Sequence, residues 1–161
     1  MSARRRPPKA GSAPRIEVAW AAGPPLLADA EVERIVRAAL AHGGRPDVGL
    51  AVSFGGEELL AELHGRHLGD PTPTDVLAFD LGEEGRGPVG EIFVGVDQAR
   101  AEAERRGVDV RRELSLYVIH GALHLCGYDD RDPASRRRMR AAERAVLLAL
   151  GRATDRRSGG E

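Results

Sequence analysis

A long apolar segment near the carboxyl end of the chain most constrains its fold. From Leu114 to Cys126, apolar residues occur on nearly all sides of a helix, so we predict a central helix that other elements cover. Asp109 precedes this segment and is its expected N-cap. His120 and His124 interrupt the apolar run four residues apart, which places both imidazoles on one helical face. Because neutral imidazole is a good ligand for zinc and its first-row neighbours, this face is a candidate metal-binding element.

A third ligand is predicted just beyond the helix. Gly127 stands three residues past His124, where a glycine in the left-handed conformation can end the helix and let the chain double back. Asp130 stands six residues past His124, and the pattern H-x-x-x-H-x-x-G-x-x-D therefore predicts His120, His124 and Asp130 as metal ligands. Three protein ligands leave one coordination position open, which is typical of catalytic sites and not of structural ones.

Other residues offer alternative interpretations. Each histidine alone would more often be a core residue without a ligand role. Cys126 is only two residues from His124, so a core position fits it better than a ligand role. His64 and His67 lie on a second helical segment and could complete the site, although a surface position is the simpler interpretation.

Gly121 distinguishes the pattern from that of the H-E-x-x-H peptidases. In those enzymes a glutamate at this position acts as general base, so proteolysis by their mechanism has no base here. We expect the glycine to leave room beside the metal. No general base is identifiable from the sequence, and the catalytic residues other than the metal ligands are unknown.

Two motifs together resemble a known family. The segments His120-Gly-x-Leu-His124-Leu-x-Gly127-Tyr-Asp129 and Pro73-Thr-Asp-Val-Leu-Ala-Phe79 are similar to the YbeY family of bacterial ribosome-associated, metal-dependent endoribonucleases. The resemblance runs from about Ile16 to Gly151. Members of that family usually carry a third histidine where this chain has Asp130.

A second departure concerns an arginine that many members carry before the Pro-Thr-Asp stretch. Leu68 stands at this position, and Arg66 is nearby but out of register. Thr74 and Asp75 can also be explained by local structure alone, because both side chains can satisfy backbone donors at a turn. The resemblance implies that the strand after them lies along the substrate cleft.

The resemblance also implies an activity. The implied activity is that of a single-strand-specific endoribonuclease. It would act in rRNA maturation, at the 3′ end of 16S rRNA, and in ribosome quality control. One divalent metal ion would be the cofactor, Zn²⁺ first and Mn²⁺ as the alternative. Ribosomal RNA and the small ribosomal subunit would be the partners. Two rival classes stay open: a noncatalytic ribosome-assembly factor with a structural metal, and a metal-dependent hydrolase of another substrate.

Length and composition set the remaining bounds. The 161 residues suit one ordinary domain, and the formal net charge of -1 conceals arginines that crowd residues 4–6 and 136–140. The second arginine group is a candidate for phosphate contacts, or else an ordinary solvated face. A single cysteine fits a reducing cytoplasm, and no stretch is long enough to span a membrane. We expect a disordered basic tail at 1–14, one domain at 15–151 and a polar tail at 152–161.

The order of expected elements predicts an α+β fold with one mixed sheet of about four strands and about five helices. Strands are expected at residues 16–20, 48–54, 76–81 and 89–96, and helices at about 29–42, 57–68, 98–106, 110–126 and 133–150. Asp97 and Asp132 are the expected N-caps of the third and fifth helices. The two late strands suit an antiparallel hairpin, and the earlier strands, which helices separate, suit parallel pairing.

Overall fold

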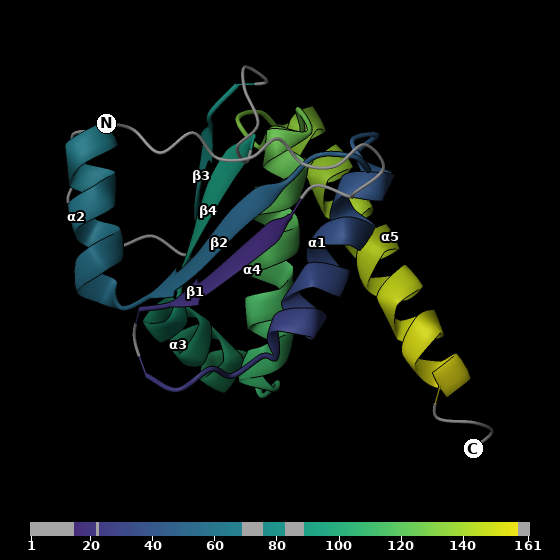
Figure 1. Ribbon diagram of the computed structural model, residues 1–161, viewed down its shortest axis with the longest axis horizontal. Helices are drawn as coiled ribbons and strands as arrows, with labels where there is room; N and C mark the ends of the chain where they lie inside the picture. Colours follow the sequence, from purple (N-terminus) through teal and green to yellow (C-terminus); the bar gives the residue numbers. More distant parts are fainter. Residues whose placement is uncertain (1–14, 22, 69–75, 83–88, 158–161) are drawn as a thin grey trace, which may run out of the picture.

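Nine regular elements follow one another in the computed structural model, which describes residues 15–21, 23–68, 76–82 and 89–157, without the side chains of 64–68 and 152–157 (Figure 1). They are β1 (Ile16–Trp20), α1 (Asp29–His42), β2 (Leu50–Gly55), α2 (Glu57–Leu68), β3 (Val76–Asp80), β4 (Gly90–Gly95), α3 (Val96–Arg106), α4 (Val110–Leu125) and α5 (Pro133–Arg157). This order confirms the predicted α+β class. None of the described helices is long and apolar enough to cross a membrane.

The strands form one mixed sheet in the order β1-β2-β4-β3. β1 pairs with β2 and β2 with β4 in parallel, whereas β3 and β4 are antiparallel, as predicted for the late hairpin. Side chains at alternate positions of β2 and β4 are buried on one face: Leu50, Val52, Phe54, Ile92 and Val94. Strand alternation thus supplies an apolar floor on which helices can pack.

Helix α4 occupies the centre of the helical layer. It contacts α1, α3 and α5 as well as β3 and β4, while α2 lies on the opposite side of the sheet (Figure 1). Leu114, Val118, Ile119 and Leu123 of α4 are fully buried, which confirms the prediction of a central helix covered on several sides. The helix that carries the two histidines is therefore held rigidly.

The close contact between α4 and β4 depends on Gly121. This residue is buried, and a Cβ atom at its position would lie 2.7 Å from Cγ2 of Ile92 on β4. We had expected the glycine to leave room beside a metal ion. That expectation was wrong, because a side chain at position 121 would point toward Ile92 in the sheet. Gly121 allows the helix to approach the strand, which is a packing role.

Three element boundaries differ from the sequence prediction by more than one residue. α3 begins at Val96 with Gly95 as its N-cap, so Asp97 does not cap it; the Asp97 carboxylate instead accepts a hydrogen bond from the backbone N–H of Glu57 at 2.7 Å. β2 begins at Leu50, two residues later than expected. α5 continues past residue 150 to Arg157, because a single glycine costs a helix only about 1 kcal/mol.

Candidate metal centre

The chain reverses direction after α4 as the sequence predicts. Gly127 has a φ of 101°, in the left-handed region, and the N–H of Tyr128 donates to the carbonyl of Leu123 at 3.1 Å. This bond closes a Schellman motif, which ends a helix and turns the chain back beside it. As a result, Oδ2 of Asp130 lies 3.6 Å from Nε2 of His120. Two of the three predicted ligands are thus brought together by one turn.

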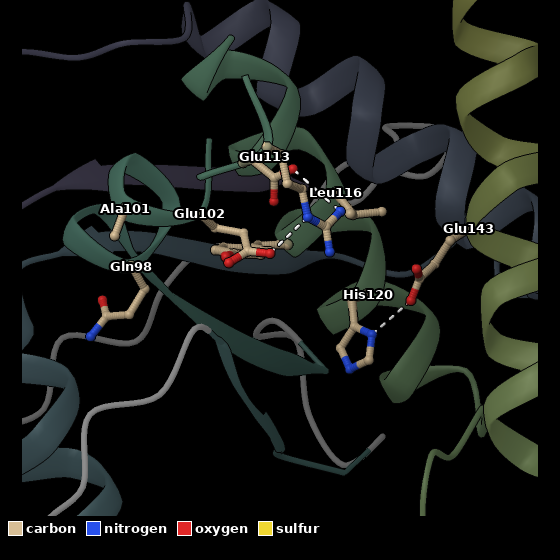
Figure 2. A pocket seen from close by; sticks show the side chains of 9 residues that line it. Gln98, Ala101, Glu102, Glu113, Leu116, His120 and Glu143 are labelled. Atoms are coloured by element: carbon tan, nitrogen blue, oxygen red, sulfur yellow. Dashed lines mark hydrogen bonds and ion pairs between the residues drawn. The ribbon is translucent and has the colours of Figure 1, made fainter. Parts of the chain in front are cut away.

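The other ring nitrogen of His120 is held by a residue of α5. Oε1 of Glu143 lies 2.8 Å from Nδ1 of His120, and both side chains are largely buried (Figure 2). A carboxylate can only accept here, so Nδ1–H is the donor and Nε2 carries the lone pair in the neutral ring. A carboxylate on the far nitrogen is the usual partner of a metal-ligating histidine, because it sets ring orientation and tautomer.

The separation of the two facing groups suits a metal ion. Bonds of about 2.0–2.2 Å in a tetrahedron place two ligand atoms about 3.4 Å apart, close to the 3.6 Å between His120 Nε2 and Asp130 Oδ2. Among the described residues, no group of three or more His, Cys, Asp or Glu side chains is arranged to hold a metal ion. The structure therefore pairs His120 with Asp130, while His124, exposed at the end of α4, does not complete such a group.

Neighbouring acids brace the turn that carries Asp130. Oδ1 of Asp129 accepts from the backbone N–H of Asp130 at 2.7 Å, and Oδ2 lies 3.3 Å from Nε of Arg131. Asp132 caps α5, as predicted, by accepting from the N–H of Ser135 at 2.8 Å and from its hydroxyl at 2.9 Å. The Ser135 backbone N–H, followed by its hydroxyl, lowers the pKa of the Asp132 carboxyl. The polypeptide on both sides of Asp130 is thus anchored.

Cys126 packs against the carboxyl end of α1. A Cβ atom on Gly43 would collide with its Sγ atom, which shows how closely the two helices meet. Burial raises the pKa of the Cys126 thiol, and only the thiolate is a good metal ligand. This placement favours the core interpretation of the cysteine.

Several other candidate residues lie outside the described part of the molecule. The side chains of His64, His67 and Leu68 belong to this group, as does that of Arg66. The Pro-Thr-Asp stretch at residues 73–75 and the basic tail at 1–14 also fall outside the described residues. Their predicted roles stay predictions.

Sequence reasoning missed two acids beside His120. Glu143 lies on α5, for which the sequence singled out only the arginines at 136–140. Glu113 lies seven residues before His120, which is two turns along the same face of α4, and its side chain is only 3% exposed. The available signal was this spacing, because an acid at i−7 from a candidate ligand shares its helical face.

A cavity of about 540 Å³ opens beside His120, between α3, α4 and α5 (Figure 2). Its lining includes Glu113, Leu116 and His120 from α4, Gln98 and Ala101 from α3, and Glu143 from α5. Such a volume falls within the range of about 300–1,000 Å³ that small-molecule sites occupy. The His120–Glu143 pair thus forms one wall of a space that a substrate group could enter.

Known proteins are similar to this chain over most of its length. The family model described as endoribonuclease YbeY matches residues 26–151. An endoribonuclease YbeY of Thermobifida fusca is 34% identical over 153 residues, which cover 87% of this chain and 96% of the relative. That of Bacillus licheniformis is 32% identical over 134 residues, covering 76% and 85%.

A solved structure of another protein has a similar fold. The solution structure of a Thermotoga maritima protein aligns with a TM-score of 0.59 and 26% sequence identity, covering 91% of this chain and 96% of the other. The family match spans most of the chain, including the helix, the turn and both residues of the His120–Asp130 pair. The chain therefore belongs to the YbeY family of endoribonucleases.

Proposed function

We propose that this endoribonuclease is metal-dependent and cleaves single-stranded ribosomal RNA. The observation that carries the metal part is the His120 imidazole, whose Nδ1 is held by Glu143 while its Nε2 faces Asp130. The relatives' name, endoribonuclease, supports the RNA part. The specific proposal is maturation of the 3′ end of 16S rRNA and ribosome quality control, with the small ribosomal subunit as partner in the cytoplasm.

In this proposal His120, His124 and Asp130 hold one divalent ion, Zn²⁺ first and Mn²⁺ as the alternative. When bound, the ion supplies a Lewis acid that polarises a phosphate oxygen and lowers the pKa of water. Asp130 makes the ligand set one unit more negative than three histidines would, which favours harder ions such as Mn²⁺. Glu143 fixes the ring of His120, and Asp129 fixes the turn, so the ligands are held before substrate arrives.

Exposed arginines at the start of α5 lie next to this site. Nη1 of Arg136 lies 3.4 Å from the carbonyl oxygen of Asp130, and Arg137, Arg138 and Arg140 are exposed on the following turns. Guanidinium groups in such a position suit the phosphates that flank a scissile bond. We therefore propose that this arginine group contacts the RNA backbone.

The test is cleavage of a single-stranded RNA before and after metal removal. We expect the purified chain to cut the RNA, to lose this activity with a chelator, and to regain it with added Zn²⁺ or Mn²⁺. A casein substrate serves as the control, since the base of the H-E-x-x-H peptidases is replaced by Gly121. Metal and RNA binding without cleavage would instead favour a noncatalytic assembly factor.

Glu143 provides a prediction about the ion itself. Glu143→Ala should weaken metal binding by about 10- to 100-fold, because His120 loses the acceptor that orients its ring. Glu143→Gln should retain most of the affinity, since an amide oxygen can also accept from Nδ1–H. The readout is the metal Kd from competition with a fluorescent chelator.

The control for this experiment is Glu104→Ala, which removes an exposed acid on α3 and should leave the Kd unchanged. Equal affinities for the Glu143→Ala variant and the unmodified chain would show that the His120–Glu143 bond serves packing alone.

A further inference from the structure

The cavity beside His120 contains buried acceptors that the proposed metal chemistry does not use. Within the described part of the chain, no group donates a hydrogen bond to Oε2 of Glu113 or to Oε1 of Gln98, and both atoms are buried. Oε1 of Glu113 lies 3.6 Å from Nη1 of Arg106, so only half of this carboxylate is paired. Buried acceptors nearly always have a donor, from the protein, from water or from a ligand, and these two are therefore open to a ligand that carries donors.

The charges of the cavity restrict what that ligand can be. Glu102, Glu113 and Glu143 contribute three carboxylates to the lining, against two guanidinium groups: that of Arg106 in the lining and that of Arg105, which is hydrogen-bonded to Glu102. This excess of negative charge disfavours a phosphate. A second divalent ion next to Glu113 is also disfavoured, because the guanidinium of Arg106 already lies 3.6 Å from Oε1 of Glu113 and would repel it. A neutral group that donates hydrogen bonds fits best.

The walls of the cavity add a shape requirement. Ala101, Leu116 and Tyr117 give it apolar surface between the polar groups. Glu113 and His120 stand seven residues apart on α4, or about 10 Å along the helix axis. A ligand that reaches from the proposed metal ligands to Glu113 would therefore have to span about this length, with Arg106 displaced from the Glu113 carboxylate. Figure 2 shows Glu113, Leu116 and His120 in this order along the helix.

We propose that this cavity is a subsite for a nucleobase that carries an exocyclic amino group. The inference rests on the proposed RNA substrate, whose phosphate would lie at His120 while its base extends toward Glu113. Cytosine presents an amino donor at N4, and a carboxylate is its usual acceptor in recognition. Uracil presents the O4 acceptor at the equivalent position and would set oxygen against oxygen. The subsite thus discriminates cytosine from uracil, two bases of nearly equal size.

Arg106 is the movable wall of this subsite. Its side chain is 51% exposed and is hydrogen-bonded to Glu102 through Nε at 2.7 Å. Because an exposed arginine has many rotamers, it can turn outward and give a base access to Glu113 without any change in the backbone.

The experiment compares two single-stranded oligonucleotides, oligo(C) and oligo(U), as substrates of the full chain loaded with Zn²⁺ or Mn²⁺. We expect oligo(C) to be cut faster by roughly 10- to 100-fold, the effect of one hydrogen bond to a buried charged acceptor. Glu113→Gln should bring this ratio close to one, since an amide can donate to O4 of uracil as readily as it accepts from cytosine. A ratio near one in the unmodified chain overturns the proposal.

A second variant keeps the test decisive if Glu113→Gln does not fold. Ala101→Trp fills the cavity from its exposed edge and should also remove the preference for oligo(C). Ala149→Trp places the same side chain at an exposed position of α5 that does not line the cavity, and it should leave the preference intact. An equal loss in both tryptophan variants would count against the subsite.

Binding separates this proposal from the proposed function. Fluorescence anisotropy of labelled oligo(C) and oligo(U) is measured with the full chain in the presence of a chelator, so that no cleavage intervenes. Tighter binding of oligo(C) without any cleavage by the metal-loaded chain would support the subsite and contradict the endoribonuclease proposal. Cleavage of both oligonucleotides at equal rates would support the endoribonuclease proposal and contradict the subsite.

Discussion

Replacing Asp130 with alanine should abolish tight metal binding and, with it, RNA cleavage. In the structure, Oδ2 of Asp130 lies 3.6 Å from Nε2 of His120, so the substitution removes one of the two proposed ligand groups that face each other. A site with two imidazoles and no carboxylate is an incomplete set for a catalytic ion. Metal content of the purified variant, measured by mass spectrometry, should fall well below one equivalent.

Two companion variants distinguish a ligand from a structural acid. Asp130→His should keep a full equivalent of metal and shift preference toward Zn²⁺, because imidazole is a softer donor than carboxylate. Asp129→Ala should still bind the metal, but with an affinity about 10- to 100-fold lower. The reason is that the Asp129 carboxylate accepts a hydrogen bond from the Asp130 N–H and so shapes the turn. If Asp130→Ala retains a full equivalent of metal, the third ligand lies elsewhere, and Asp129, His64 and His67 become the residues to test.

Gly121→Glu should leave little folded protein, although it creates the H-E-x-x-H sequence of a peptidase motif. Any Cβ at this position collides with Ile92, and a glutamate would also bury a charge against the sheet without a partner. The cost of several kcal/mol is a large part of the roughly 5–15 kcal/mol that holds a domain together. Circular dichroism and thermal unfolding would show the loss, and no proteolysis should appear.

Smaller substitutions locate the cause of that loss. Gly121→Ala should destabilise by about 1–3 kcal/mol through overpacking, despite the better helix propensity of alanine. The same change should cost less in an Ile92→Ala background, which removes the colliding methyl group. Gly151→Ala, on α5 with nothing within 4 Å, should instead stabilise by about 0.5–1 kcal/mol. Equal effects at Gly121 and Gly151 would contradict the packing role.

The fold was largely predictable because its signals are local. Alternation in β2, the apolar face of α1 and the nearly continuous apolar run of α4 each identified an element and its burial. Asp109 and Asp132 behaved as helix caps, because a carboxylate that precedes a helix can accept from its first free N–H groups. Asp97 failed this rule because Gly95 ends the strand and starts the helix, which puts Asp97 inside the first turn.

The candidate site was predictable only where one segment supplies it. The spacing from His120 through Gly127 to Asp130 predicted a reversal, and the structure contains it. Glu143 was not predicted, because its partner lies 23 residues away on a different helix and no local pattern reports that docking. The role of Gly121 was misjudged for the same reason, since Ile92 reaches it from another element. The sequence therefore did not predict those parts of the site that depend on contacts between different elements.

The bond between His120 and Glu143 has a consequence for the time at which the site becomes competent. Glu143 follows His120 by 23 residues and belongs to the last described helix. During synthesis, a chain that has emerged as far as α4 already carries both histidines, but the ring of His120 has no carboxylate on Nδ1 to orient it. Orientation arrives only when α5 has emerged and docked. Until then, His120 lacks the acceptor that fixes its ring, so the proposed metal site is completed only by the last described helix.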